Sequence, residues 1–168
     1  NPSADVRLFG QELMGQSYAV GLAEMLIKNQ NAENFRHADT LKTDCFPQHK
    51  MRFVIENPPF GTPWSGADAK EGQEEDRKVR RWLLEQDLIE SIIAMPTDLF
   101  YNTGIATYVW IISKNKRPER KGLIQLIDAT QIYHKLRKPL GNKKNEFKPE
   151  DRARITRLYA DFAENERC

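Results

Sequence analysis

The four residues Asn57-Pro58-Pro59-Phe60 constrain this chain more than any other stretch of its sequence. Each proline fixes its own φ and pushes the residue before it toward extended backbone, so the pair forms a stiff corner. The apolar run 53–55 precedes this corner, separated from it by Glu56. That run predicts a buried strand whose end lies at the carboxyl edge of a sheet, where open α/β sheets bind their ligands.

The corner is suited to hold a planar amino group. Because prolines have no N–H, the carbonyl of Pro58 and the side-chain oxygen of Asn57 offer two acceptors for the hydrogens of such a group. Two acceptors favour a pyramidal nitrogen with a free lone pair, which methyl transfer to an aromatic amine requires. Phe60 adds a flat face on which an extruded base can stack, worth roughly 1–3 kcal/mol. The alternative interpretation is an ordinary proline-rich turn.

Composition excludes several classes of protein. The chain has 168 residues and a formal net charge of +2, so it can hold one ordinary domain and any nucleic-acid surface must be local. Its two cysteines and three histidines are scattered, so neither a disulfide framework nor a metal site is predicted. The scattered cysteines fit a reducing cytosol, and neither a membrane span nor a secretory leader is predicted.

Helical and strand patterns alternate along the chain. Helices are predicted over 17–29, over 79–86 with Trp82 and Leu83 inward, and from 149 onward. The apolar face of the first helix would contain Ala19, Leu22, Ala23, Leu26 and Ile27, and that of the last Ile155, Leu158, Tyr159 and Phe162. Strands are predicted to end near Phe9 and to span 53–55, 88–95, 107–112 and 123–127. Residues 61–76 read as a mobile loop, and the basic tract 135–148 reads as poor in strands. The pattern predicts an α/β sheet with helical cover.

Two acidic residues precede the tetrapeptide, and both are expected at strand ends. Glu12 follows a short apolar run, and an acidic side chain just past a strand can accept both hydroxyls of a ribose. Asp39 can accept from the amino group of an adenine ring. A solvated loop glutamate and an aspartate that caps a turn are the alternatives, and both remain open.

Several segments together carry a resemblance to a known family. They are residues 8–12, 23–27, 34–41, 56–61, 92–105, 128–129 and 140–143. The chain resembles the methyltransferase (modification) subunit of type I restriction-modification systems, which are adenine-specific DNA methyltransferases. Several methyltransferase families share the tetrapeptide, whereas the run 99–105 is more particular to this one.

The resemblance implies a fold and a role for each matching residue. The fold would be a Rossmann-like class I methyltransferase sheet with helices on both faces, incomplete in this chain. Glu12 would hold the ribose of S-adenosylmethionine, Asp39 its adenine, and Asn57, itself next to the cofactor, would hold the flipped target adenine with Pro58, Pro59 and Phe60. Transfer would be direct, without a covalent enzyme intermediate. The implied partners are double-stranded DNA, a sequence-specificity subunit and a restriction (translocase) subunit, in a prokaryotic cytoplasm.

The sequence departs from the family pattern in two places. The glycine-rich loop expected before Glu12 is not found, and a helix and strand expected near 71–79 are missing. Residues 1–134 are therefore predicted to form a partial catalytic core, and 135–168 a basic linker and C-terminal helix of the same domain.

Other functions stay open. The same pocket would suit a methyltransferase acting on a protein glutamine or an RNA base, and the missing loop would suit a non-catalytic remnant. The basic tract could contact DNA phosphates, with a solvated face as the alternative. Its cations are Lys135, Arg137, Lys138, Lys143, Lys144 and Lys148, and Lys143 and Lys144 are the candidate contacts chosen for a test. The sequence does not reveal the DNA site, the source organism or the stoichiometry of the assembly.

Overall fold

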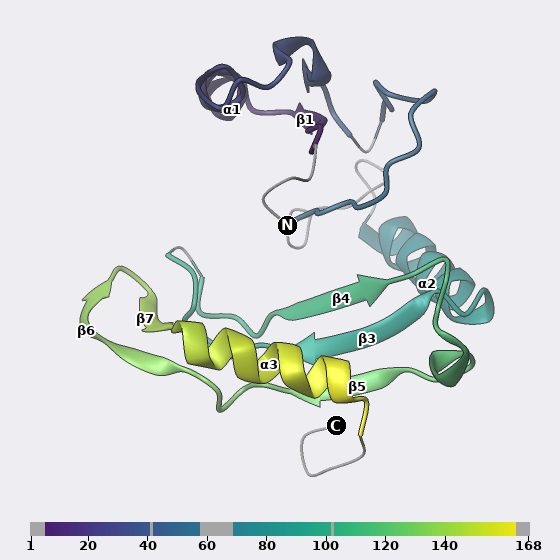
Figure 1. The fold of residues 1–168 in the computed structure, drawn as a ribbon, viewed down its shortest axis with the longest axis vertical. Helices are drawn as coiled ribbons and strands as arrows, with labels where there is room; N and C mark the ends of the chain where they lie inside the picture. Colours follow the sequence, from purple (N-terminus) through teal and green to yellow (C-terminus); the bar gives the residue numbers. More distant parts are fainter. Residues whose placement is uncertain (1–5, 41, 58–68, 102, 164–168) are drawn as a thin grey trace. The chain divides into compact units, whose positions relative to one another are not determined.

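The computed structural model of the chain describes residues 6–40, 42–57, 69–101 and 103–163 (Figure 1). The chain divides into two compact units, Asn1–Asp68 and Ala69–Cys168. The first unit contains β1 (Gly10–Glu12), α1 (Gly15–Ile27), the 3-10 helix η1 (Ala32–Asn34) and β2 (Phe35–His37). The second contains α2 (Ala69–Glu85), β3 (Ile89–Ala94), β4 (Tyr108–Ile112), the 3-10 helix η2 (Pro118–Arg120), β5 (Gln125–Asp128), β6 (His134–Leu140), β7 (Lys143–Glu146) and α3 (Pro149–Asp161).

The first unit is a strand–helix–strand crossover packed around one aromatic ring. β1 and β2 pair in parallel, which requires the crossover that α1 supplies. The ring of Phe35 fits against two glycines: a Cβ on Gly10 would lie 2.6 Å from it and one on Gly21 2.5 Å from it. Tyr18 stacks on the same ring, with centroids 5.3 Å apart. Gly10 on β1 and Gly21 on α1 therefore leave room for the ring of Phe35 on β2.

Three predictions for the first unit need correction. The strand predicted to end near Phe9 begins at Gly10 instead, as β1. The helix over 17–29 is confirmed as α1, but its buried residue is Met25, while Leu26 and Ile27 are 62% and 79% exposed. The buried strand over 53–55 is wrong: these residues form no strand, and Ile55 is 98% exposed. A strand needs a hydrogen-bonded neighbour, and the described sheet of this unit contains β1 and β2 alone.

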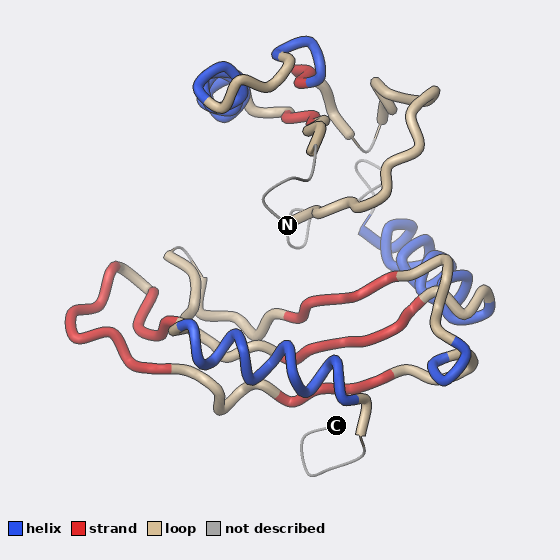
Figure 2. Tube along the Cα trace, viewed as in Figure 1, coloured by secondary structure: helices blue, strands red, loops and turns tan. Residues whose placement is uncertain are grey.

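The second unit is built on a three-stranded sheet with α3 across one face (Figure 2). Central β3 pairs antiparallel with β4 and parallel with β5, so the predicted strands over 88–95, 107–112 and 123–127 are confirmed. The core contains Ile93, Ile127, Ala129 and Ile132. Three residues of α3 pack against this core, namely Ile155, Leu158 and Tyr159. The helix predicted from 149 onward is therefore confirmed.

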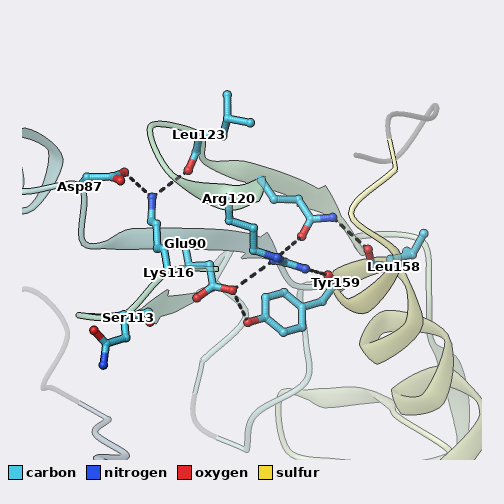
Figure 3. Close-up of polar contacts among 10 residues, drawn as sticks. Asp87, Glu90, Ser113, Lys116, Arg120, Leu123, Leu158 and Tyr159 are labelled. Atoms are coloured by element: carbon cyan, nitrogen blue, oxygen red, sulfur yellow. Dashed lines mark hydrogen bonds and ion pairs between the residues drawn. The ribbon is translucent and has the colours of Figure 1, made fainter. Parts of the chain in front are cut away.

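A buried polar cluster fastens the end of α3 to this sheet (Figure 3). The guanidinium of Arg120, which is 2% exposed, donates to the carbonyl of Tyr159, and its Nη1 lies 3.3 Å from Oε1 of Glu90. The Tyr159 hydroxyl donates to the same Glu90 oxygen over 2.7 Å. Gln125 Nε2 donates to the carbonyl of Leu158 over 2.9 Å. These donors satisfy carbonyls in the last turn of the helix, which have no partner within it.

Beside that cluster, Lys116 fastens the turn before β3 to the segment that leads into β5 (Figure 3). Its Nζ lies 2.5 Å from Oδ1 of Asp87 and donates to the carbonyl of Leu123 over 2.8 Å. The other carboxylate oxygen of Asp87 accepts from the amide of Gly122 over 2.8 Å. These contacts keep the pKa of Asp87 below its usual value, the hydrogen bond from Lys116 contributing most.

Three predictions for the second unit are also wrong. The predicted loop over 61–76 lies partly outside the described residues, and it is wrong from Ala69 onward, where α2 begins. The helix over 79–86 is confirmed as the last part of α2. Trp82 is 53% exposed rather than inward. The strand-poor tract over 135–148 contains β6 and β7, an antiparallel hairpin whose turn uses Gly141 at φ 60°.

In the part of the chain that the structure describes, no helix is both long and apolar enough to cross a bilayer.

Candidate functional site

The predicted acidic residues lie at the carboxyl ends of neighbouring strands. Glu12 is the last residue of β1 and pairs in register with His37, the last residue of β2. Asp39 follows two residues later, and the amide of Ala38 donates to the carbonyl of Glu12 over 3.1 Å. Because the two strands are parallel, both carboxylates belong to the same sheet edge.

The carboxylate of Glu12 is held by its own backbone. Its Oε1 accepts from the amide of Met14 over 2.7 Å, which fixes the carboxylate at the turn into α1. Its second oxygen accepts no hydrogen bond from any residue within 6–40, 42–57, 69–101 and 103–163. That oxygen can accept from a bound hydroxyl group.

Asp39 organises the turn after β2. Its carbonyl accepts from the amides of Lys42 and Thr43 over 3.1 and 2.9 Å, and Lys42 Nζ lies 3.2 Å from its Oδ2. The side chain is 24% exposed. Asp39 therefore begins a main-chain turn, and its half-buried carboxylate lies at the sheet edge.

Gln11 braces this turn, and sequence reasoning missed it. Its Nε2 donates to the carbonyl of Thr43 over 2.7 Å, and its Oε1 accepts from the amide of Cys45 over 2.9 Å. One side chain thus bonds to main chain on both sides of Asp44. Its place next to Glu12 could have drawn attention to Gln11, but the sequence does not show which groups an amide side chain in a strand will contact.

The structure brings together Glu12 and Asp39 but does not test the tetrapeptide. Asn57 is exposed and lies in no helix or strand, while Pro58, Pro59 and Phe60 lie outside the described residues. Within the described ranges, no group of three His, Cys, Asp or Glu side chains is arranged to hold a metal ion.

In the second unit, the turn after β3 and the β6–β7 hairpin form one assembly. Asp98 has a left-handed backbone with φ 58°, and its carbonyl accepts from the amides of Lys144 and Asn145 over 2.9 and 3.1 Å. The side chain of Asn145 donates to the carbonyl of Thr97 over 2.9 Å. The amide of Asn142 donates to the carbonyl of Tyr101 over 3.1 Å. The hairpin is thereby tied to the segment that begins the run 99–105.

The two lysines predicted to contact DNA already have partners in this assembly. Lys144 Nζ lies 3.5 Å from Oδ2 of Asp98. Lys143 Nζ lies over the ring of Tyr101, 5.1 Å from its centroid. Their charges are therefore partly engaged within the protein.

Comparison with known proteins gives consistent matches over the whole chain. The model of the family described as N-6 DNA Methylase matches residues 1–77 and 69–168. The methylase subunit of the type I restriction enzyme MjaVIII from Methanocaldococcus jannaschii is 35% identical over 98 residues, or 58% of this chain and 16% of that protein. The MjaVII methylase subunit of the same organism is 37% identical over 102 residues, or 61% of this chain and 17% of that protein.

A solved structure has a similar fold. It is the methyltransferase subunit of a type I restriction-modification system from Streptococcus thermophilus, with a TM-score of 0.74 and 22% identity. The match covers 95% of this chain and 43% of that one. This chain therefore corresponds to a part of each of these longer proteins.

Proposed function

Because the chain belongs to the N-6 DNA methylase family, we propose that it is part of an enzyme that methylates the exocyclic amino group of adenine in DNA. The methyl donor would be S-adenosylmethionine, and the enzyme would be the modification subunit of a type I restriction-modification complex. Double-stranded DNA, a specificity subunit and a restriction subunit would be its partners, in a prokaryotic cytoplasm. The type I methylase subunits among its relatives support this assignment.

The single observation that best supports the proposal is the shared edge of β1 and β2. Glu12 ends one parallel strand, and Asp39 follows the next. Carboxylates at such an edge suit the adenosine half of the donor, since one accepts from ribose hydroxyls and the other from an adenine amino group. The donor supplies an electrophilic methyl group when bound. Glu12 and Asp39 would bind the donor and orient it.

The remaining residues would act on the substrate base. Asn57 and the carbonyl of Pro58 would accept from the target amino group, Pro59 would stiffen the corner, and Phe60 would stack on the flipped base. Extrusion is required because the amino group is paired within the duplex. The proposed contribution of Asn57 is to free the nitrogen lone pair and align it for in-line attack.

The chain would supply only part of a Rossmann-like catalytic core. The family model matches in two blocks that meet at residues 69–77, near the predicted missing helix and strand. The alignment to the MpnII methylase subunit of Mycoplasma pneumoniae is 186 positions long, although it covers only 76% of this 168-residue chain. The relative therefore has residues with no counterpart in this chain, which also supports an internal gap. Residues 1–134 as the partial core and 135–168 as its extension remain our proposed division.

A binding experiment tests the donor site. In the complete polypeptide that contains this chain, Glu12→Gln should weaken S-adenosylmethionine binding roughly 10-fold or more, because a charged acceptor for hydroxyl groups is lost. Glu24→Gln is the matched control, because Glu24 lies on α1 and pairs with Lys28 over 2.8 Å. Calorimetry that finds equal affinities for the two variants would reject Glu12 as a donor contact.

A transfer experiment tests the reaction. Tritium from labelled donor should appear in duplex DNA with the parent polypeptide and its specificity subunit, and Asn57→Ala should lower the rate roughly 100-fold by removing one positioned acceptor. Label found in RNA or protein instead would identify another substrate class. An Asn57→Ala variant as active as the parent would remove Asn57 from the mechanism.

A further inference from the structure

The β6–β7 hairpin has a fixed place on the second unit. Asp98 and Thr97 anchor it through Lys144 and Asn145, as described above. At the same end of the hairpin, where Lys135 pairs with Asn145, Nδ1 of His134 lies 2.7 Å from Oδ2 of Asp151, near the start of α3. At the turn end, the amide of Asn142 donates to the carbonyl of Tyr101 over 3.1 Å. Figure 1 shows β6 and β7 extending beyond one end of the three-stranded sheet. Attachment at both ends means that charges on β6 are presented in a defined arrangement.

Three cations of β6 differ from the two lysines of β7. Lys135, Arg137 and Lys138 are exposed, and none makes a hydrogen bond or ion pair with the residues that the structure describes. Lys143 and Lys144 contact Tyr101 and Asp98, as given above. Of the five Lys and Arg side chains in β6 and β7, Lys144 alone has a carboxylate partner among the described residues, and three of the other four lie on β6.

The spacing of these cations suits a linear polyanion. Lys135, Arg137 and Lys138 fall within four consecutive residues of β6, a span of about 10 Å in extended backbone. The pairing of β6 with β7 is irregular between Lys135 and Leu140, so the strict alternation of faces does not apply to these side chains. Lys138 extends the positive charge toward the hairpin turn. Exposed cations without a carboxylate partner can neutralise phosphates and release the counterions condensed on them.

We propose that Lys135, Arg137 and Lys138 bind the phosphodiester backbone of duplex DNA. The choice of DNA as partner rests on the proposed function. The assignment moves the expected phosphate contact from Lys143 and Lys144 to the opposite strand of the hairpin. It makes β6 a sequence-independent contact, in keeping with an enzyme whose DNA site would be chosen by another subunit.

The salt dependence of binding tests this surface. The complete polypeptide is titrated against a fluorescein-labelled DNA duplex of arbitrary sequence at several KCl concentrations, with anisotropy as the signal. The variant K135Q/R137Q/K138Q should lower the magnitude of the slope of log K against log[KCl] by roughly 2–3, since each phosphate contact contributes about 0.9. Its thermal unfolding should match that of the parent, because these side chains are exposed.

The matched control removes the same charge elsewhere on the unit. Lys114, Arg117 and Lys121 are exposed residues of the connection between β4 and β5, at the other end of the sheet (Figure 1). The variant K114Q/R117Q/K121Q should keep the parent slope. Equal losses in both triple variants, or an unchanged slope in the β6 variant, would overturn the proposal. If the β6 substitutions changed the slope for duplex RNA but left the slope for duplex DNA unchanged, the choice of DNA as the partner would be overturned.

The two proposals can fail separately. DNA binding that depends on β6, in a polypeptide that transfers no methyl group, would reject the proposed function and keep this surface. Methyl transfer to DNA with no dependence of the salt slope on β6 would reject the surface alone.

Discussion

The hydroxyl of Tyr159 and the carboxylate of Glu90 are joined by a hydrogen bond of 2.7 Å between α3 and β3. Nη1 of Arg120 lies 3.3 Å from the same Glu90 oxygen, and the guanidinium stacks on the ring of Tyr159 with 4.5 Å to its centroid. Three residues far apart in the sequence thus share one buried contact. The attachment of α3 to the sheet depends on their joint geometry.

Removal of Arg120 should destabilise the second unit strongly. Arg120→Ala leaves the buried carboxylate of Glu90 and the carbonyl of Tyr159 without their cation, at a cost of about 3–5 kcal/mol. Adding Glu90→Gln should recover part of the loss, because no unpaired charge then stays buried. Urea unfolding followed by tryptophan fluorescence measures both, with the exposed Arg117→Ala as control. A loss below 1 kcal/mol would show that the network contributes little.

The same contact predicts a loss of stability in alkali. Burial and then the hydrogen bond to Glu90 raise the pKa of Tyr159 above its ordinary value near 10. The stabilisation is therefore complete below about pH 10 and is lost as pH rises toward the folded-state pKa. Tyr159→Phe should flatten this part of the curve of unfolding free energy against pH. A curve of the same steepness in both proteins would assign the effect to other groups.

Asp151 predicts the opposite dependence in acid. The amide of Lys148, with a smaller effect of His134, lowers the pKa of this carboxyl group below its ordinary value. Its stabilising effect is present above about pH 4 and is lost as pH falls through the lowered pKa. Asp151→Asn should make the second unit less sensitive to acid between pH 5 and 2, measured by circular dichroism. Glu150→Gln, at an exposed neighbour, is the control and should leave the acid transition in place.

The two glycines of α1 should respond in opposite ways to the same substitution. Gly21→Ala places a methyl group 2.5 Å from the ring of Phe35 and should destabilise the first unit by roughly 1–3 kcal/mol. Gly15→Ala meets His37 at an ordinary 3.9 Å and should stabilise the helix by up to about 1 kcal/mol. Hydrogen exchange of the amides in β2 reports both. Two variants with equal protection would mean that Phe35 can move aside.

Local patterns were sufficient to predict the elements that bury their own apolar residues. The run over 88–95 predicted β3, and the spacing of Ile155, Leu158 and Tyr159 predicted the face of α3 that contacts the core. The run over 53–55 looked equally apolar but remains exposed. Whether a strand forms depends on a neighbour elsewhere in the chain, and the sequence of one segment does not show that neighbour.

The basic hairpin was missed for a related reason. Its residues have low strand propensity. The hairpin is held by bonds from Lys144 and Asn145 to Asp98, and Asp98 lies 46 residues before Lys144 in the sequence. In the candidate site, Glu12 and Asp39 could be placed near strand ends from their order alone. The bracing role of Gln11 could not, because its partners at Thr43 and Cys45 follow an irregular turn.

The left-handed Asp98 carries one more implication. Two successive amides of β7 converge on its single carbonyl, so the length of the hairpin and the length of the turn are matched to each other. An insertion into either segment would pull the pair of bonds out of alignment unless the other changed as well. Among natural variants, these two loops should therefore gain and lose residues together.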